Sequence, residues 1–148
     1  MVADDWHLSI REEEMPVRDL IKRKVVVVEP DDTVRLAAKR MEDKMVGSLV
    51  VIDGDKPVGI ITDRDIAIRV VAQGKSPETP VKEVMTKEPI TVREDATFFE
   101  LTKVFRDAAV RRVVVVDKDG RLVGLISVDD AMELLTTEFA NLIAAIRG

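Results

Sequence analysis

Residues 59–65 read Gly-Ile-Ile-Thr-Asp-Arg-Asp, and residues 124–130 read Gly-Leu-Ile-Ser-Val-Asp-Asp, 65 positions further along the chain. Each copy follows a valine-rich run and an acidic turn, at 50–55 in the first copy and at 113–120 in the second. Self-similarity at a fixed spacing indicates a repeated supersecondary unit. The sequence therefore predicts two copies of one unit that pack against each other, each carrying an equivalent hydroxyl and carboxylate.

The composition is that of a globular chain with enough apolar material for a core. Of the 148 residues, 46% are hydrophobic and 34% are charged. No apolar run approaches the roughly 20 residues needed to span a bilayer, so we expect no membrane association. Cysteine is absent, which excludes disulfides and thiolate metal sites, and we expect a cytoplasmic protein. The one basic run longer than two residues, Lys22-Arg23-Lys24, is interpreted as a solvated segment.

Each half of the chain predicts the element order β-α-β-β-α after a short opening helical turn. Apolar residues recur at helical spacing over 34–41 and again over 98–105. Continuous apolar runs are typical of strands that are covered on both faces. The expected elements are 17–20, 25–28, 34–41, 49–52, 58–61 and 63–72 in the first half, and 81–84, 89–92, 98–105, 113–116, 122–126 and 128–136 in the second.

The fold class expected is α+β, with the two repeats packed in pseudo-two-fold symmetry. The division of the chain is an N-terminal extension (1–15), repeat 1 (16–71), a linker (72–79), repeat 2 (80–135) and a C-terminal amphipathic helix (136–148). In this last segment Phe139, Leu142, Ile143 and Ile146 lie at helical spacing. They cover either the core or a partner subunit, and core cover is the simpler expectation.

Two residue pairs suit a nucleoside. Thr62 and Asp65 are three positions apart at the expected start of a helix, as are Ser127 and Asp130. This spacing puts a hydroxyl and a carboxylate on one side of the first turn, where they can bind the vicinal hydroxyls of a ribose. Free N–H groups at the helix start suit a phosphate. The same spacing also makes a variant capping box, and both roles can coexist.

These repeats, each ending in a strand, Gly, two apolar residues, Thr/Ser-x-x-Asp and a helix, resemble a tandem pair of CBS domains, or Bateman module. The resemblance extends from about Pro16 to Leu135 and is closest to the stand-alone members of the family. It implies a non-enzymatic regulatory module that binds an adenosine-containing nucleotide in clefts between the repeats. AMP is the first expectation, with ADP, ATP or S-adenosylmethionine as alternatives. It also implies a homodimer that signals to a regulated protein by a conformational shift.

The resemblance also implies which residues bind the nucleotide. Each cleft combines the Thr/Ser-x-x-Asp of one repeat with backbone of the other. One cleft is expected to contain Ser127, Asp130, Val26, Val46, Gly47 and Ser48, the other Thr62, Asp65, Ile90 and Val110, and phosphates are expected to meet Arg64, Arg111 and Arg112. Repeat 1 has Gly47-Ser48 where repeat 2 has the arginine pair, and this departure weakens phosphate binding from that side. Alternatively, the two arginines pair with acids such as Asp107.

Catalysis finds little support in the sequence. His7 is the only histidine, and it lies in the extension beside Trp6, which could anchor that segment to another surface. Tyrosine and cysteine are absent, and there is no glycine-rich phosphate loop or metal-ligand cluster. We therefore expect no enzyme, no metal and no catalytic cofactor. The rival hypotheses are a ligand-free scaffold homodimer and a nucleic-acid-binding protein that uses Lys22–Lys24 with Arg111-Arg112; the net charge of −5 argues against the second.

Overall fold

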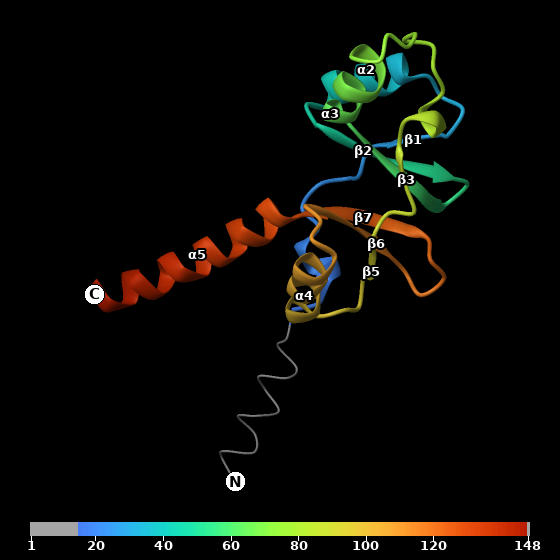
Figure 1. Ribbon diagram of the computed structural model, residues 1–148. Coiled ribbons are helices and arrows are strands. Elements are labelled where there is room, and N and C mark those ends of the chain that lie inside the picture. Colours follow the sequence, from blue (N-terminus) through green and yellow to red (C-terminus); the bar gives the residue numbers. More distant parts are fainter. Residues whose placement is uncertain (1–14, 148) are drawn as a thin grey trace.

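Two small sheets meet at the centre of the molecule: a four-stranded sheet formed by repeat 1 with one short strand of repeat 2, and a three-stranded sheet formed by repeat 2 (Figure 1). The structure is a computed structural model that describes residues 15–147; Gly148 and residues 1–14, with Trp6 and His7, lie outside the described residues. The elements of repeat 1 are η1 (Val17–Leu20), β1 (Val27–Val28), α2 (Val34–Lys44), β2 (Ser48–Asp53), β3 (Lys56–Thr62), α3 (Asp63–Ile66) and the π-helical turn η2 (Ala67–Val71). Those of repeat 2 are η3 (Val81–Glu83), β4 (Thr86–Lys87), β5 (Thr91–Arg93), α4 (Phe98–Ala108), β6 (Arg112–Val116), β7 (Leu122–Ser127) and α5 (Val128–Arg147).

The two repeats have the same topology, which confirms the expected α+β fold. In repeat 1, β1 runs parallel to β2, and β2 pairs with β3 as an antiparallel hairpin. Repeat 2 pairs β5, β6 and β7 in the same way. The hairpin register shifts between Val51 and Ile52 in one repeat and between Val115 and Val116 in the other. Parallel strands need a crossover, and the helices α2 and α4 supply it.

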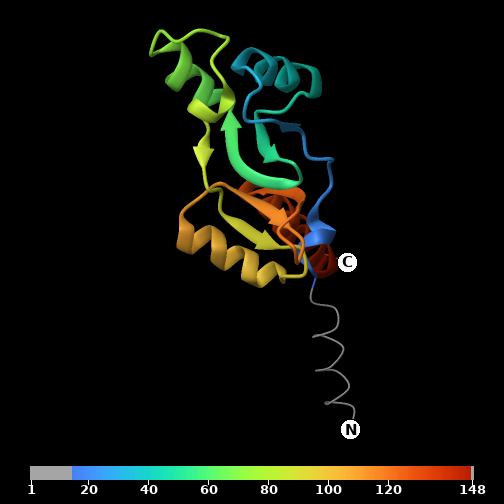
Figure 2. The same ribbon diagram turned by 90° about the vertical axis from the view of Figure 1, so that its right-hand side faces the viewer.

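The central strands are buried on both faces, as their continuous apolar sequence predicts. Side chains alternate along a strand, so Leu49 and Val51 face the helices of repeat 1 while Val50 faces the other sheet. Val50 packs there with Val114 of β6, and both are fully buried. Figure 2 shows the resulting layers, with α2 and α3 on one outer side, α4 on the other and the sheets between them. This shared apolar layer joins the repeats into one body.

The opening turns are exchanged between the repeats. The sequence division puts η1 in repeat 1, but its Val17 and Leu20 pack in the core of repeat 2, and Val17 N donates to the Ala96 carbonyl at 2.7 Å. Reciprocally, Val81 of η3 packs in the core of repeat 1, and its N–H donates to the Asp32 carbonyl at 2.8 Å. Each repeat therefore completes its core with a segment that precedes the other repeat.

The C-terminal segment does not cover the core, contrary to the simpler expectation. The expected helices at 128–136 and 136–148 are one continuous helix, α5, which projects from the body (Figure 1). Phe139 and Leu142 are each 65% exposed, and Ile146 is 85% exposed. No glycine or proline interrupts residues 128–147, so the sequence supplies none of the residues that commonly kink a helix. Over residues 15–147, no helix combines the length and apolar character that crossing a bilayer requires.

Candidate functional site

The two hydroxyl–carboxylate pairs form capping interactions at the starts of α3 and α5. Thr62 Oγ1 accepts from Asp65 N at 3.0 Å, and Asp65 Oδ2 accepts from Thr62 N at 3.0 Å. Ser127 and Asp130 make the same reciprocal pair, with both distances at 3.1 Å. Each cap uses one carboxylate oxygen and leaves the hydroxyl proton available for donation. Capping is therefore observed, and it leaves Oδ1 of Asp130 without a hydrogen bond from residues 15–147.

A cavity of about 290 Å³ lies between the repeats, next to the pair Ser127–Asp130. Repeat 1 and its preceding segment form one wall, and β6, β7 and the start of α5 form the other. The cavity brings together seven of the residues expected to bind a nucleotide: Val26, Val46, Gly47, Ser48, Arg112, Ser127 and Asp130. Because these residues come from both repeats, a molecule bound here would contact the two repeats at once.

Strand register places Arg112 beside Ser127. The two residues are direct partners in the antiparallel pair β6–β7, and partners of this kind have their side chains on the same face of the sheet. At the matching position of repeat 1, Thr62 is paired with Ser48. The expected difference between the repeats is therefore present in the structure, since the cross-strand partner of Ser127 is an arginine and that of Thr62 is a serine.

The other arginine of the pair, Arg111, does not line the cavity. Its side chain is 75% exposed and lies 3.7 Å from Asp129 Oδ1. The alternative pairing with Asp107 is not observed; Asp107 instead accepts a hydrogen bond from Arg106 Nε at 2.9 Å. This contact lowers the pKa of the Asp107 carboxyl below its ordinary value. Of the two adjacent arginines, Arg112 alone lines the cavity.

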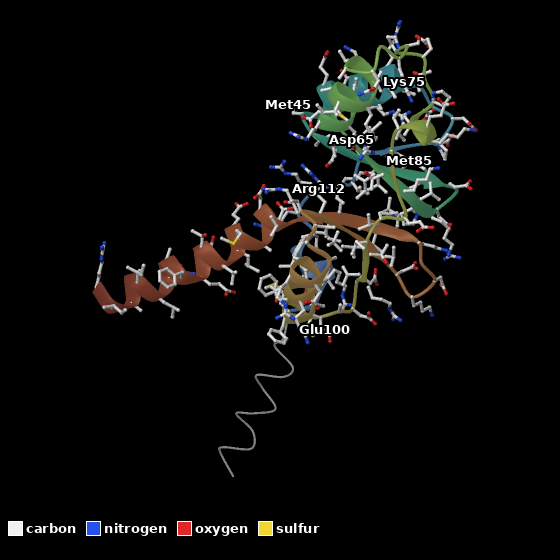
Figure 3. All side chains as sticks on the ribbon, in the orientation of Figure 1. Met45, Asp65, Lys75, Met85, Glu100 and Arg112 are labelled. Atoms are coloured by element: carbon white, nitrogen blue, oxygen red, sulfur yellow. The ribbon has the colours of Figure 1, made fainter. Side chains whose placement is uncertain are left out.

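Eight residues that the sequence analysis did not assign to the site line the same cavity: Leu20, Lys22, Arg23, Lys24, Val25, Met45, Leu125 and Asp129. Lys22, Arg23 and Lys24 are exposed, as expected, but they also contribute to the cavity lining. Met45, the C-cap residue of α2, adopts a left-handed backbone conformation (φ 55°) and is 90% exposed. Figure 3 shows Met45 and Arg112 on the side of the molecule from which α5 projects. The sequence could have indicated that the basic run lines the cavity, because the run lies just before Val26, which was assigned to the cleft.

The residues expected in the second cleft are not gathered around this cavity. Asp65 Oδ1 lies 3.6 Å from Arg69 Nη2, so the carboxylate already faces a cation. The Ile90 carbonyl accepts from Val114 N at 2.9 Å, and Val110 packs against the core of repeat 2. Arg64 is exposed at the start of α3. The two pairs thus have the same caps but different surroundings.

The cavity carries an excess of positive charge. Its lining includes four cationic side chains, Lys22, Arg23, Lys24 and Arg112, and the carboxylates Asp129 and Asp130. Asp129 is shared with Arg111 outside the cavity, which further weakens the negative contribution. Within residues 15–147, no group of three or more His, Cys, Asp or Glu side chains is arranged to hold a metal ion. The arrangement is suited to an organic anion that has hydroxyl groups at one end.

Comparison with known families agrees with this architecture. The family model of the CBS domain matches residues 17–72 and, a second time, residues 81–137. The chain belongs to the CBS domain family. The match confirms the resemblance found in the sequence and includes the opening turns η1 and η3 within the two CBS domains.

Relatives of this CBS pair occur in bacteria and archaea. CBS domain-containing protein YhcV of Bacillus subtilis is 33% identical over 126 residues, which cover 84% of this chain and 89% of YhcV. An uncharacterised protein of Methanopyrus kandleri is 35% identical over 120 residues, covering 80% of this chain but only 61% of that protein. The inosine-5'-monophosphate dehydrogenase of Korarchaeum cryptofilum is 34% identical over 121 residues, which are 24% of its length. The CBS pair therefore occurs both in short chains and within larger proteins.

Solved CBS structures include complexes with adenosine compounds. The CBS domain protein PAE2072 from Pyrobaculum aerophilum, complexed with AMP, is 31% identical with a TM-score of 0.71, covering 78% of this chain and 89% of its own. The CBS domain pair of protein MJ0100, in complex with 5'-methylthioadenosine and S-adenosyl-L-methionine, is 27% identical with a TM-score of 0.74, covering 84% and 98%. Similar CBS pairs thus bind small adenosine ligands.

Proposed function

We propose that this CBS pair is a non-enzymatic regulatory module that binds an adenosine-containing nucleotide in the cavity beside Ser127 and Asp130. The observation that carries the proposal is the meeting, in one cavity, of a hydroxyl–carboxylate pair from one repeat with apolar walls from the other. Arg112 adds a cation next to Ser127. The AMP and S-adenosyl-L-methionine complexes of similar CBS pairs support the same ligand class. A cytoplasmic location is part of this proposal.

Each part of the ligand has a group of matching chemistry. The unused oxygen of Asp130 accepts hydrogen bonds from the ribose hydroxyls, and Ser127 donates its hydroxyl proton. Val26 and Val46 provide apolar surface for the adenine ring, and the Met45 side chain lies where its thioether can contact the ring edge. Arg112 meets the first phosphate. The cap and the ligand use different oxygens of the same carboxylate, so both roles are compatible.

Signalling follows from the position of the cavity between the repeats. A ligand shifts a conformational equilibrium by its difference in affinity for the two states. The two sheets meet through an apolar layer that includes Val50 and Val114, so a small change in their packing alters the relative position of α3 and α5. A partner protein that contacts these helices would respond to ligand binding.

A ligand-binding screen tests the proposal against the scaffold hypothesis. The purified chain, shown to be free of nucleotide by its absorbance spectrum, is titrated with AMP, ADP, ATP, S-adenosylmethionine and GMP while its unfolding is followed. A ligand at 100 times its dissociation constant adds about 2.7 kcal/mol to the free energy of unfolding. Stabilisation restricted to adenosine compounds is the expected result. A response to none of these compounds would favour the ligand-free scaffold.

The exposed face of α5 favours a second copy of this chain as its partner. Met132, Leu135, Phe139, Leu142 and Ile146 follow the alternating spacing of three and four residues that is typical of paired helices. All five are between 43% and 85% exposed in the single chain. We therefore include a homodimer in the proposal, formed by pairing of two α5 helices through this stripe.

Charge favours an antiparallel pair of α5 helices. Asp129 and Glu133 lie near the start of α5, and Arg147 is the basic residue of its last turn. If two helices cross at Phe139, Arg147 of one lies beside residues 129–133 of the other, on the same flank of the pair. A parallel pair would instead bring the acidic helix starts together, which is unfavourable.

Light scattering after size-exclusion chromatography tests the homodimer. Leu142→Lys puts a charge in the stripe, whereas Thr137→Lys makes the same charge change on the opposite face of α5. We expect the parent chain and Thr137→Lys to be dimers and Leu142→Lys to dissociate. Because the chain has no cysteine, a mixture of Met132→Cys and Ile146→Cys forms mixed disulfides only if the pair is antiparallel. A dimeric Leu142→Lys variant would exclude this interface.

A further inference from the structure

The segment Lys22-Arg23-Lys24, here called the basic arm, gives the cavity a cluster of three cations that the matching segment of repeat 2 lacks. All three side chains are exposed and line the cavity that contains Ser127 and Asp130. Within residues 15–147, no carboxylate lies within 4.0 Å of these three cations. The arm therefore places three positive charges beside the cavity, and none of them forms an ion pair with a carboxylate of residues 15–147.

The two repeats differ at this position. The residues that match the basic arm, 64 positions later, are Thr86-Lys87-Glu88. Thr86 and Lys87 form β4, which pairs with β3, and Thr86 Oγ1 accepts from Arg69 Nη1 at 3.2 Å. The basic arm pairs with no strand. One copy of this segment is thus a sheet edge with no net charge, and the other is a cationic, unpaired segment beside the cavity.

Size and charge together indicate what the arm would contact. The cavity volume of about 290 Å³ is at the lower end of the range for small-molecule sites, so a nucleoside and its first phosphate would leave little room inside. Further phosphates would extend toward solvent, where the exposed side chains of the arm are available to contact them. Each added phosphate brings further negative charge and further acceptor oxygens, and three cations line the cavity in addition to Arg112.

Resting on the proposed function, we infer that this cavity selects nucleotides with two or three phosphates over AMP, and that the basic arm determines this preference. Arg112, beside Ser127, contacts the first phosphate and does not distinguish among the nucleotides. Lys22, Arg23 and Lys24 contact the phosphates beyond it. The second hydroxyl–carboxylate pair, Thr62–Asp65, has no such arm and carries no such preference.

Calorimetric titration in magnesium-free buffer tests the inference. AMP, ADP and ATP are each titrated into the full chain, into a variant with all three arm residues replaced by Ala, and into a control variant of equal charge change. We expect ATP to bind the parent chain about tenfold more tightly than AMP, from several exposed ion pairs acting together, and the difference to shrink as salt is raised. The control replaces exposed cations that do not line the cavity: Lys75, Lys103 and Lys118.

The outcomes separate the inference from the proposed function. Loss of the ATP preference in the arm variant, with AMP affinity nearly unchanged and the control like the parent, supports the inference. The retained AMP affinity also shows that the arm variant is folded. Equal affinities of the parent for AMP, ADP and ATP would overturn the inference. An ATP preference that survives in the arm variant would overturn it as well. Both results would leave the proposed function standing. Absence of binding by all three nucleotides would overturn both.

Discussion

Replacing Asp130 by Asn separates the two roles of this carboxylate. The amide keeps an oxygen that can accept from Ser127 N, a contact of 3.1 Å in the structure, but it removes the negative charge. Without nucleotide, the variant should lose about 0.3–1 kcal/mol of unfolding free energy, because an acid near a helix start interacts favourably with the helix dipole. The matched variant Asp65→Asn changes the same cap in repeat 1, and also weakens an ion pair with Arg69.

With nucleotide the two variants should differ. A hydrogen bond to a charged group contributes about 1.5–3 kcal/mol, so losing the charged contact to the ribose weakens binding by at least about tenfold. At a concentration that stabilises the parent by about 2.7 kcal/mol, Asp130→Asn should gain about 1.3 kcal/mol or less. Asp65→Asn should gain as much as the parent, since Asp65 does not line the cavity.

Urea unfolding followed by far-ultraviolet circular dichroism, with and without nucleotide and at one fixed protein concentration, measures both quantities. The reasoning predicts a small loss without nucleotide for both variants and a reduced nucleotide response for Asp130→Asn alone. If Asp130→Asn loses stability but keeps the full response, the carboxylate acts only as a helix cap. The assignment of the ribose site would then be refuted.

Two further predictions concern stability. Gly59→Ala should lower the free energy of unfolding by about 1–3 kcal/mol, and by more than Gly124→Ala does. A Cβ at Gly59 would lie 2.9 Å from the backbone carbonyl oxygen of Thr86, whereas a Cβ at Gly124 would meet the side chain of Ile21, which can move. Equal urea midpoints for the two variants would contradict this. The backbone N–H of Arg121 donates to Asp117 and lowers the pKa of that carboxyl from its ordinary value of 3.8. The stability that the charged carboxylate contributes is therefore fully present above this ordinary value and is lost as the pH falls through the lowered pKa. Asp117→Asn should therefore be less stable than the parent at neutral pH but not in acid, and a deficit independent of pH would disprove the link.

Local sequence patterns determined most of the secondary structure. The strands around Leu49 and Val113, the hairpins and the starts of α2 and α4 lie where the apolar runs, acidic turns and helical spacing predicted them. The helix starts are marked by hydroxyl caps, since Thr33 Oγ1 accepts from Leu36 N at 3.1 Å. These features depend on residues a few positions apart, so one sequence is enough to recognise them.

The repeat itself predicted the hydroxyl–carboxylate pairs, because two copies in register are a stronger signal than either one alone. The sequence also showed that the repeats differ beside these pairs, with Arg112 in one and Ser48 in the other. What it left open was whether the pairs are caps or ligand sites. The structure shows the caps at both pairs, and it shows a cavity that includes Ser127 and Asp130.

Tertiary structure alone decided which segments meet. Both η1 and η3 have the same local sequence pattern whether they pack on their own repeat or on the other, so the exchange was not visible in the sequence. The basic run at 22–24 is polar in either setting, and only its path past Ser127 brings it to the cavity. The apolar stripe on α5 could pack equally well against the core or against a partner subunit. The direction of the helix after Ala131 leaves this stripe exposed. Local patterns specify elements through short-range backbone and side-chain preferences, whereas the neighbours of each face depend on packing between distant parts of the chain.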